Sequence, residues 1–205
     1  MIDRARELRE LWFGHLPLSA ARLAERMRFW FGGDEPQEER RARDEQLRAR
    51  FEPLVVQAAE GKLAGWAASP RRRLSLILLL DQLPRNIYRD TPRAFAADDR
   101  ALALTVSGIQ SGADAALDVV ERIFFYMPLE HAESLEAQDE SVAAYRRLLD
   151  ETPEALREAL AGVLEHAEAH RAVIERFGRF PHRNRILGRA TTPEERKYLS
   201  KGAYP

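Results

Sequence analysis

The sequence predicts an all-α protein made of antiparallel helical hairpins. No segment shows the sustained alternation of apolar and polar residues that marks a half-buried β-strand. The connections between helical patterns are short, so neighbouring helices should pack antiparallel. Four pairs join a hydroxyl residue, which can cap a helix, to a proline suited to the first helical position: Ser69–Pro70, Thr91–Pro92, Thr152–Pro153 and Thr192–Pro193.

Helical patterns cover nine segments: 3–15, 19–31, 38–60, 70–83, 92–111, 115–127, 129–150, 153–177 and 193–201. The first two end in the same tripeptide, Trp-Phe-Gly, and the last opens on a capping box of Thr192 and Glu195. Pro53 should kink or interrupt the third helix. The fourth carries Leu74–Leu80, which is apolar nearly all round and typical of a central, buried helix.

Length and composition limit the class of protein. A chain of 205 residues can bury a substantial core, and we expect one all-helical domain over residues 1–205, with 1–18 as an N-terminal extension helix. Lys and Arg number 32 against 33 Asp and Glu, so no overall field attracts nucleic acid or an anionic membrane. The absence of cysteine excludes disulfides and thiol chemistry. We expect a cytoplasmic protein without nucleic-acid or membrane partners; the oligomeric state is not predicted.

Helical phase places several polar residues on apolar stripes. In segment 153–177, steps of three and four residues align His170 with leucine and valine positions, and His166 lies on the flank of that face. The same stepping in segment 129–150 turns His131 and Gln138 inward, and in segment 70–83 it turns Asp81 inward. A buried charge must be paired or hydrogen-bonded. We therefore expect a buried polar network.

The segment Arg176–Asn184 combines cationic and aromatic residues. It holds three arginines, a histidine and two phenylalanines, while Gly178 and Pro181 prevent it from continuing as a helix. A solvated loop does not need the rings, and a packed core does not favour the arginines. The segment is therefore either pinned against carboxylates of its own protein or shaped to hold an anion.

Catalytic motifs give little guidance. No nucleophile elbow, phosphate-binding loop or dinucleotide-binding loop is present. His166 and His170 have the spacing of a helical metal-binding pair, which Glu130 or Glu175 could complete, but the zinc-protease Glu after the first His is missing. We predict no metal and no other cofactor. His131, His170 and Glu133 are candidates for acid–base chemistry, and whether the protein is an enzyme stays open.

Several motifs occur together in a characteristic order: Phe29–Gly32, Leu80–Arg89, Met127–His131 and Arg176–Asn184 followed by Leu187–Arg189. Over about residues 27–200 the sequence resembles the bacterial family called domain of unknown function 924. The resemblance implies an all-helical fold similar to tetratricopeptide-like α-α superhelices, with no established activity. The sequence departs from the family pattern at Ala132, where serine is common, and at Arg43, where an aromatic residue is expected.

Two functions fit these observations. The first is a pocket for a small anionic ligand, lined by Asp81, Arg85, His131, His170 and Arg183, because arginine forks suit carboxylate and phosphate. The wider set of candidate ligand-binding residues adds Arg89, Gln138, Arg176, Arg179, His182 and Asn184. The alternative is a tetratricopeptide-like module that binds a partner protein, with the same residues as a structural polar network.

Overall fold

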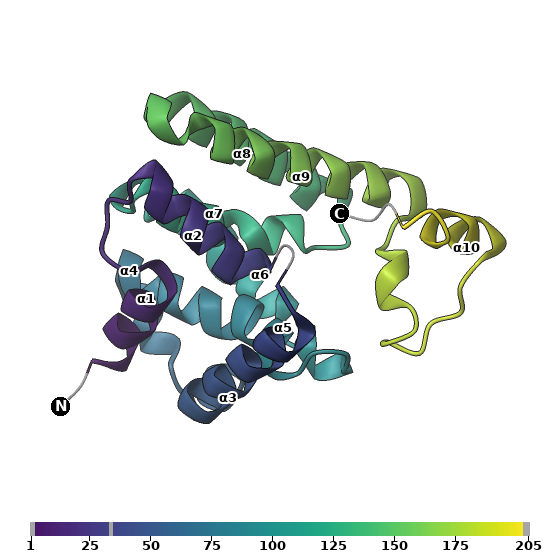
Figure 1. Cartoon of the computed structure of the whole chain (residues 1–205), viewed down its shortest axis with the longest axis horizontal. Helices are drawn as coiled ribbons and strands as arrows, with labels where there is room; N and C mark the ends of the chain where they lie inside the picture. Colours follow the sequence, from purple (N-terminus) through teal and green to yellow (C-terminus); the bar gives the residue numbers. More distant parts are fainter. Residues whose placement is uncertain (1–2, 33–34, 203–205) are drawn as a thin grey trace.

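The computed structural model describes residues 3–32 and 35–202, and within these ranges it contains helices, turns and loops but no strand. The all-α prediction is confirmed. Residues 1–2, 33–34 and 203–205 of the predicted domain lie outside the described residues. The α-helices are α1 (Arg4–Phe13), α2 (Ala20–Phe31), α3 (Gln37–Ala59), α4 (Pro70–Ile77), α5 (Leu83–Ile87), α6 (Asp98–Gln110), α7 (Val119–Glu130), α8 (Leu135–Glu151), α9 (Arg157–Phe177) and α10 (Pro193–Leu199) (Figure 1).

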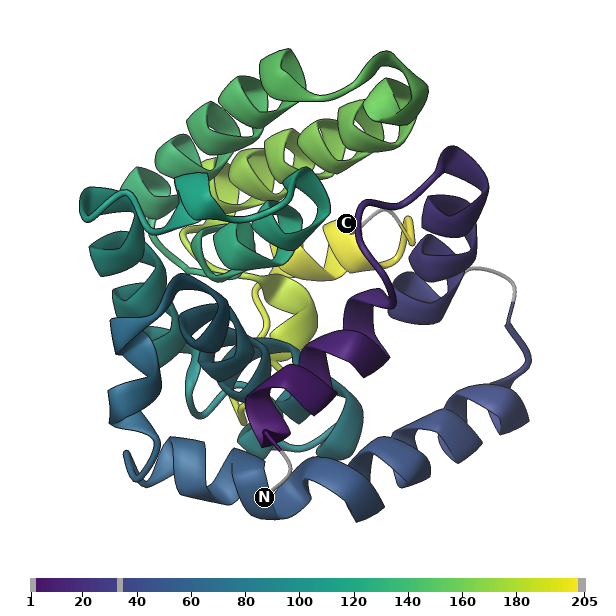
Figure 2. The ribbon, with the colours of Figure 1, turned by 90° about the vertical axis from the view of Figure 1, so that its left-hand side faces the viewer.

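The helices are arranged around one continuous core. The α8–α9 hairpin forms one edge of the molecule and α3 forms the opposite edge, as two perpendicular views show (Figures 1 and 2). Buried side chains from α1 to α9 form a single hydrophobic cluster between these edges. A smaller cluster around Val173, Ile174 and Phe180 joins the end of α9 to the segment that follows it. The superhelical stacking implied by the family resemblance stays a prediction. In the described part of the chain, every helix is too short or too polar to cross a membrane.

The central, buried helical segment from α4 to α5 contains a π-helical turn. Helices α4 and α5 are joined through Leu78–Gln82, where the Leu83 N–H donates to the Leu78 carbonyl five residues earlier. Pro84 follows directly and has no N–H to donate to the Leu80 carbonyl four residues earlier. The leucines of the turn are buried, as the sequence predicted. The turn presents Asp81 and Gln82, and π-helical turns often occur at functional sites.

Helix ends differ from prediction in two respects. The seventh predicted helix was expected to start at residue 129, but α7 continues to Glu130, His131 is its C-cap, and α8 begins after Ser134. The reason is that the Ser134 hydroxyl accepts the Ala137 N–H and fixes the start of α8 there. The fifth predicted helix also divides, since a turn separates Pro92–Ala94 from α6. Pro53, in contrast, lies inside α3 without a break in the helix.

Only one of the four hydroxyl–proline pairs caps its helix as predicted. Thr192 forms a capping box with Glu195, whereas Ser69 makes no side-chain cap bond. The hydroxyls of Thr91 and Thr152 donate back to carbonyls of the preceding turn instead. The other side-chain caps come from residues without a following proline: Asp3, Ser19, Asp118 and Ser134.

The N-terminal helix is part of the core. Leu8, Trp12 and Phe13 of α1 are almost completely buried. The rings of Trp12 and Phe13 contact Phe124 of α7 edge to face, with ring centroids 5.6 and 5.5 Å apart. The ring centroid of Trp30 in α2 lies 4.6 Å from that of Phe124. The helix in the segment predicted as an N-terminal extension therefore supplies side chains to the core.

Two helical glycines should respond oppositely to alanine. A Cβ atom at Gly108 of α6 would lie 2.4 Å from the Phe125 ring, whereas at Gly162 of α9 it would meet nothing within 4 Å. We expect Gly108→Ala to lower the free energy of unfolding by about 1–3 kcal/mol through overpacking. Gly162→Ala should raise it by about 0.5–1 kcal/mol, because alanine loses less backbone entropy in a helix. Urea unfolding of both variants measures the difference; equal effects would contradict the packing at Gly108.

Candidate functional site

A cavity of about 510 Å³ lies between α2, α5, α7 and α9, a size that lies in the range of about 300–1,000 Å³ typical of small-molecule sites. Its apolar wall includes Trp30 and Phe31 of α2 and Val163 of α9. The polar wall carries a larger group of side chains: Gln82, Arg85, Asn86, Arg89, Glu130, His131, His166 and His170. An apolar wall with convergent polar groups is the usual form of a ligand site.

Asp81 lies directly behind the cavity wall. Its side chain is fully buried, and one carboxylate oxygen is 2.8 Å from His131 Nδ1 and 3.2 Å from Arg85 Nη1. Arg85 also forms a two-pronged pair with Asp98, at 3.1 and 3.0 Å. Burial alone would raise the pKa of the Asp81 carboxyl, but Arg85 and His131 hold that pKa well below its usual value. Asp81 is therefore an ionised anchor that orients His131 at the cavity surface.

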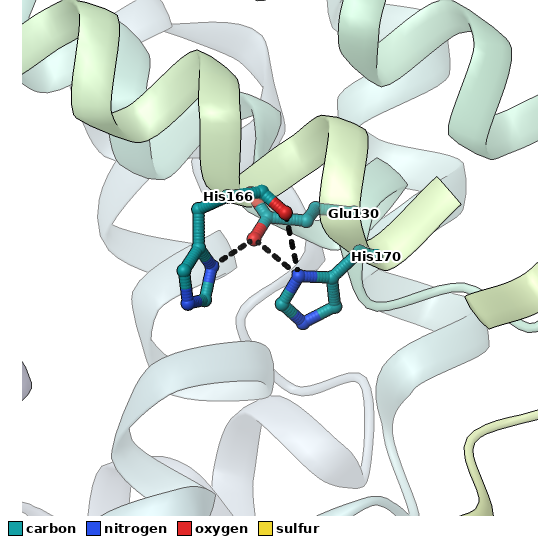
Figure 3. Close-up of side chains that lie close together, drawn as sticks. All are labelled: Glu130, His166 and His170. Carbon is teal, nitrogen blue, oxygen red and sulfur yellow. Dashed lines mark hydrogen bonds and ion pairs between the residues drawn. The ribbon is translucent and has the colours of Figure 1, made fainter. Parts of the chain in front are cut away.

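A second carboxylate, Glu130, lies between two imidazoles (Figure 3). Glu130 Oε1 is 3.1 Å from Nδ1 of His166 and 3.2 Å from Nδ1 of His170. Because both histidines are one turn apart on α9, their rings reach the same carboxylate (Figure 3). His170 Nδ1 is also 3.0 Å from the backbone oxygen of His166.

The protonation of this group follows from burial and charge. Burial would raise the pKa of Glu130, but its hydrogen bond with His166 and the nearby histidines lower that pKa overall. The hydrogen bond to Glu130 raises the pKa of His166. Burial lowers the pKa of His170 to about 4, although the Glu130 carboxylate opposes this shift. At neutral pH the group therefore combines an ionised Glu130 with a neutral His170.

Gln138 has a structural contact pattern. Its side-chain amide donates to the carbonyls of Glu130 and Ala132, at 2.6 and 2.8 Å, and it is completely buried. These carbonyls belong to the end of α7 and the turn after it, where backbone acceptors lose their helical partners. Gln138 thus fixes the end of the helix that carries Glu130, and it does not line the cavity.

The arginine-rich segment is matched by carboxylates of the protein itself. Arg176 pairs with Glu194 at 2.7 Å, and Arg179 forms a two-pronged pair with Glu195, at 2.6 and 2.9 Å. Asn184 also donates to Glu195, at 3.2 Å. None of these contacts reaches the cavity, so this part of the segment serves to attach α10 to the end of α9.

The middle of the same segment docks on the α7–α8 turn. Arg183 lies between the rings of Phe95 and Phe180, and it donates to Asp98 and to the His131 carbonyl at 3.3 and 3.0 Å. Glu133 accepts the Phe180 N–H and pairs with Arg189. Burial lowers the pKa of Arg183 to about 10 and that of His182 to about 4.

The predicted site residues therefore separate into three groups. Those that line the cavity are Arg85, Arg89, His131 and His170. Asp81 and Arg183 contact the cavity residue His131 from behind. The third group makes its contacts away from the cavity: Glu133, Gln138, Arg176, Arg179 and Asn184. His182, also of this group, packs beside the Phe180 ring.

Sequence reasoning considered Glu130 as a possible partner of the histidine pair but left both Glu130 and His166 outside the set of candidate site residues. The missing signal was the true end of α7: once the helix includes residue 130, Ile123, Met127 and Glu130 share one buried face in steps of four and three. His166 has a half-exposed side chain, so an apolar stripe could not reveal it. Glu175, the other carboxylate considered for the histidine pair, binds Arg171 on the surface.

Fold and site together define an all-helical protein with a cluster of ionisable residues beside a cavity. The chain matches the family of bacterial proteins of unknown function DUF924 over residues 8–203, and it belongs to that family. The resemblance seen in the sequence is thereby confirmed. The structure is similar to a solved structure of a protein of unknown function from Agrobacterium tumefaciens, with a TM-score of 0.71 and 38% sequence identity over 89% of this chain and 99% of that one. Among curated proteins, none matches this chain.

Proposed function

We propose that this protein binds a small molecule in the cavity between α2, α5, α7 and α9, and that the ligand carries one anionic group. The observation that carries this proposal is the convergence of Arg85, Arg89 and three imidazoles on one apolar-walled cavity. Residues 1–205 would act as one domain in which the N-terminal helix supports the α2 wall. A cytoplasmic location fits such a ligand and remains part of the proposal.

The anionic group belongs near α5. Arg85 lies on this helix and Arg89 lies in the turn that follows it, and both line the cavity together with Asn86. Both arginines already have carboxylate partners, Asp98 for Arg85 and Asp44 for Arg89. Such pairing holds a guanidinium in place, and its remaining N–H groups can still donate to a carboxylate or phosphate. In this proposal the arginines of the segment Arg176–Asn184 do not bind the anion, because they pair with Glu194, Glu195 and Asp98.

His131 is the proposed proton-transfer group. The Asp81 carboxylate at its Nδ1 fixes the ring, which favours a proton on Nδ1 and leaves Nε2 as the free nitrogen. A carboxylate–histidine pair of this kind positions an imidazole to accept or donate a proton. The proposal therefore extends to acid–base chemistry on the bound ligand, although binding is tested first.

Binding is tested on the metal-free protein with defined probes. Native mass spectrometry of the purified chain shows any retained small molecule, and thermal shift is measured with inorganic phosphate, glycerol 3-phosphate, pyruvate and citrate. We expect at least one saturable shift, and Arg89→Gln should weaken that binding about tenfold, which is about 1.4 kcal/mol. The matched control is Arg176→Gln, because the Arg176 side chain is 52% exposed against 43% for Arg89 and its carboxylate partner lies outside the cavity. A protein that retains nothing and responds to no probe contradicts the proposal.

The partner-binding alternative stays a prediction. It requires the polar residues to be spread along an open concave surface. Instead, Arg85, Arg89 and three imidazoles gather at one cavity, which favours a small ligand.

A further inference from the structure

Glu130 differs from the other buried carboxylates of the described residues. Asp81 and Glu195 are each paired with an arginine, and Glu121 accepts a backbone N–H in the capping box of α7. The ion pairs described for Glu130 are with imidazoles alone, His166 and His170. Burying a carboxylate is costly unless a full positive charge compensates it. The atoms that face the Glu130 carboxylate are two imidazole nitrogens, which are themselves common metal ligands.

The spacing of the three side chains matches that of ligands around one small cation. Zinc bonds of about 2.0–2.2 Å to nitrogen and oxygen place neighbouring ligand atoms of a tetrahedron about 3.3–3.5 Å apart. Glu130 Oε1 lies 3.1 and 3.2 Å from the two Nδ1 atoms, and one ligand atom from each residue falls within 4.8 Å of the others.

The surroundings also suit a metal centre. The three residues line the cavity, which leaves a further coordination position open to water or a ligand, as in catalytic zinc sites. The i,i+4 pair on α9 fixes both imidazoles, and Gln138 holds the Glu130 backbone. A nitrogen that binds metal must give up its proton, so the contact between His170 Nδ1 and the His166 carbonyl would be replaced by the metal bond.

We propose that Glu130, His166 and His170 form a binding site for a divalent first-row transition-metal ion, with zinc as the test ion. Two imidazoles and one carboxylate with open positions are a donor set used by zinc and by ferrous iron. This inference goes beyond the proposed ligand cavity and does not depend on it. It also departs from the sequence-based prediction that no metal is bound, because that prediction was made before Glu130 was placed between the histidines.

Zinc titration of the chelator-stripped full chain tests the site. Competition with a chromophoric chelator should show one tightly bound equivalent, and Co²⁺ should give the visible absorption of low-coordinate cobalt. His166→Ala and Glu130→Gln should each weaken binding at least about tenfold. His15→Ala is the matched control, since that histidine is exposed and lies in a different surface hollow.

The decisive variant is His166→Ala, because the His166 side chain is 56% exposed and its loss should leave the fold intact, which circular dichroism verifies. Zinc binding as tight in His166→Ala as in the unmodified chain overturns the inference. So does the absence of one-equivalent binding by the unmodified chain. Because the ligand experiment above is carried out without metal, either proposal can fail while the other stands.

Discussion

Asp81→Ala is expected to lower the free energy of unfolding by about 3–5 kcal/mol, as is typical when one partner of a buried ion pair is removed. The Asp81 carboxylate accepts from His131 and Gln82 and forms an ion pair with Arg85, and the side chain is buried. Without it, the Nδ1 of His131 loses its acceptor, and Arg85 keeps its pair with Asp98. Urea unfolding followed by circular dichroism measures the loss. A change below about 1 kcal/mol would show that water replaces the carboxylate freely.

The pH dependence of stability provides a second readout. The pKa of Asp81 is lower in the folded state than in the unfolded chain. The stabilisation of the fold by the ionised Asp81 carboxylate is therefore fully present above the pKa of the unfolded chain, which is about 4. The contribution is lost as the pH falls below that value. The destabilisation caused by Asp81→Asn, a nearly isosteric control without charge, should therefore shrink between about pH 5 and pH 2. A pH-independent difference would contradict the ionised state of Asp81.

Phe124→Ala should be comparably damaging, with a loss of about 3–5 kcal/mol. The Phe124 side chain is fully buried, and four aromatic rings surround it: Trp12, Phe13, Trp30 and Phe31. Alanine removes the ring that joins α1 and α2 to α7 and leaves a cavity too enclosed to collapse. Thermal and urea unfolding both report the change.

Phe31→Ala is the matched control for this cluster. The Phe31 ring stacks on Phe124 at 6.3 Å but is 49% exposed, so its removal should cost less than half as much as the loss of Phe124. Similar losses for the two variants would mean that the stack, rather than burial, stabilises the cluster.

The class of fold could be predicted because helical periodicity and short connections are local features. The burial of the helical segment Leu74–Leu80 could be predicted from its apolar run, and the inward orientation of His170 could be predicted from the phase of one helix. Helix ends were less accessible. Pro53 and Pro128 both stand inside helices, so proline positions alone misplaced the boundary before His131.

The candidate site could be predicted only in part, since the pairing of charges depends on tertiary structure. Asp81 and His131 are fifty positions apart, and their contact required the packing of α7 against the π-helical turn. The partners of the arginine-rich segment were equally hidden: Glu194 and Glu195 lie beyond it in the chain, and nothing in their spacing shows that they turn back on Arg176 and Arg179. The cationic surplus of that segment is a property of the sequence that the folded protein neutralises.

The aromatic contacts of Phe124 have a consequence for synthesis of the chain. Trp12, Phe13 and Trp30 leave the ribosome about a hundred residues before Phe124, the ring on which they pack, so they cannot make this contact as they emerge. Nascent chains that end before α7 should therefore keep these rings accessible to chaperones. Protection of the N-terminal helices should begin only when residue 124 has cleared the exit tunnel, which makes the first helices to be translated late participants in folding.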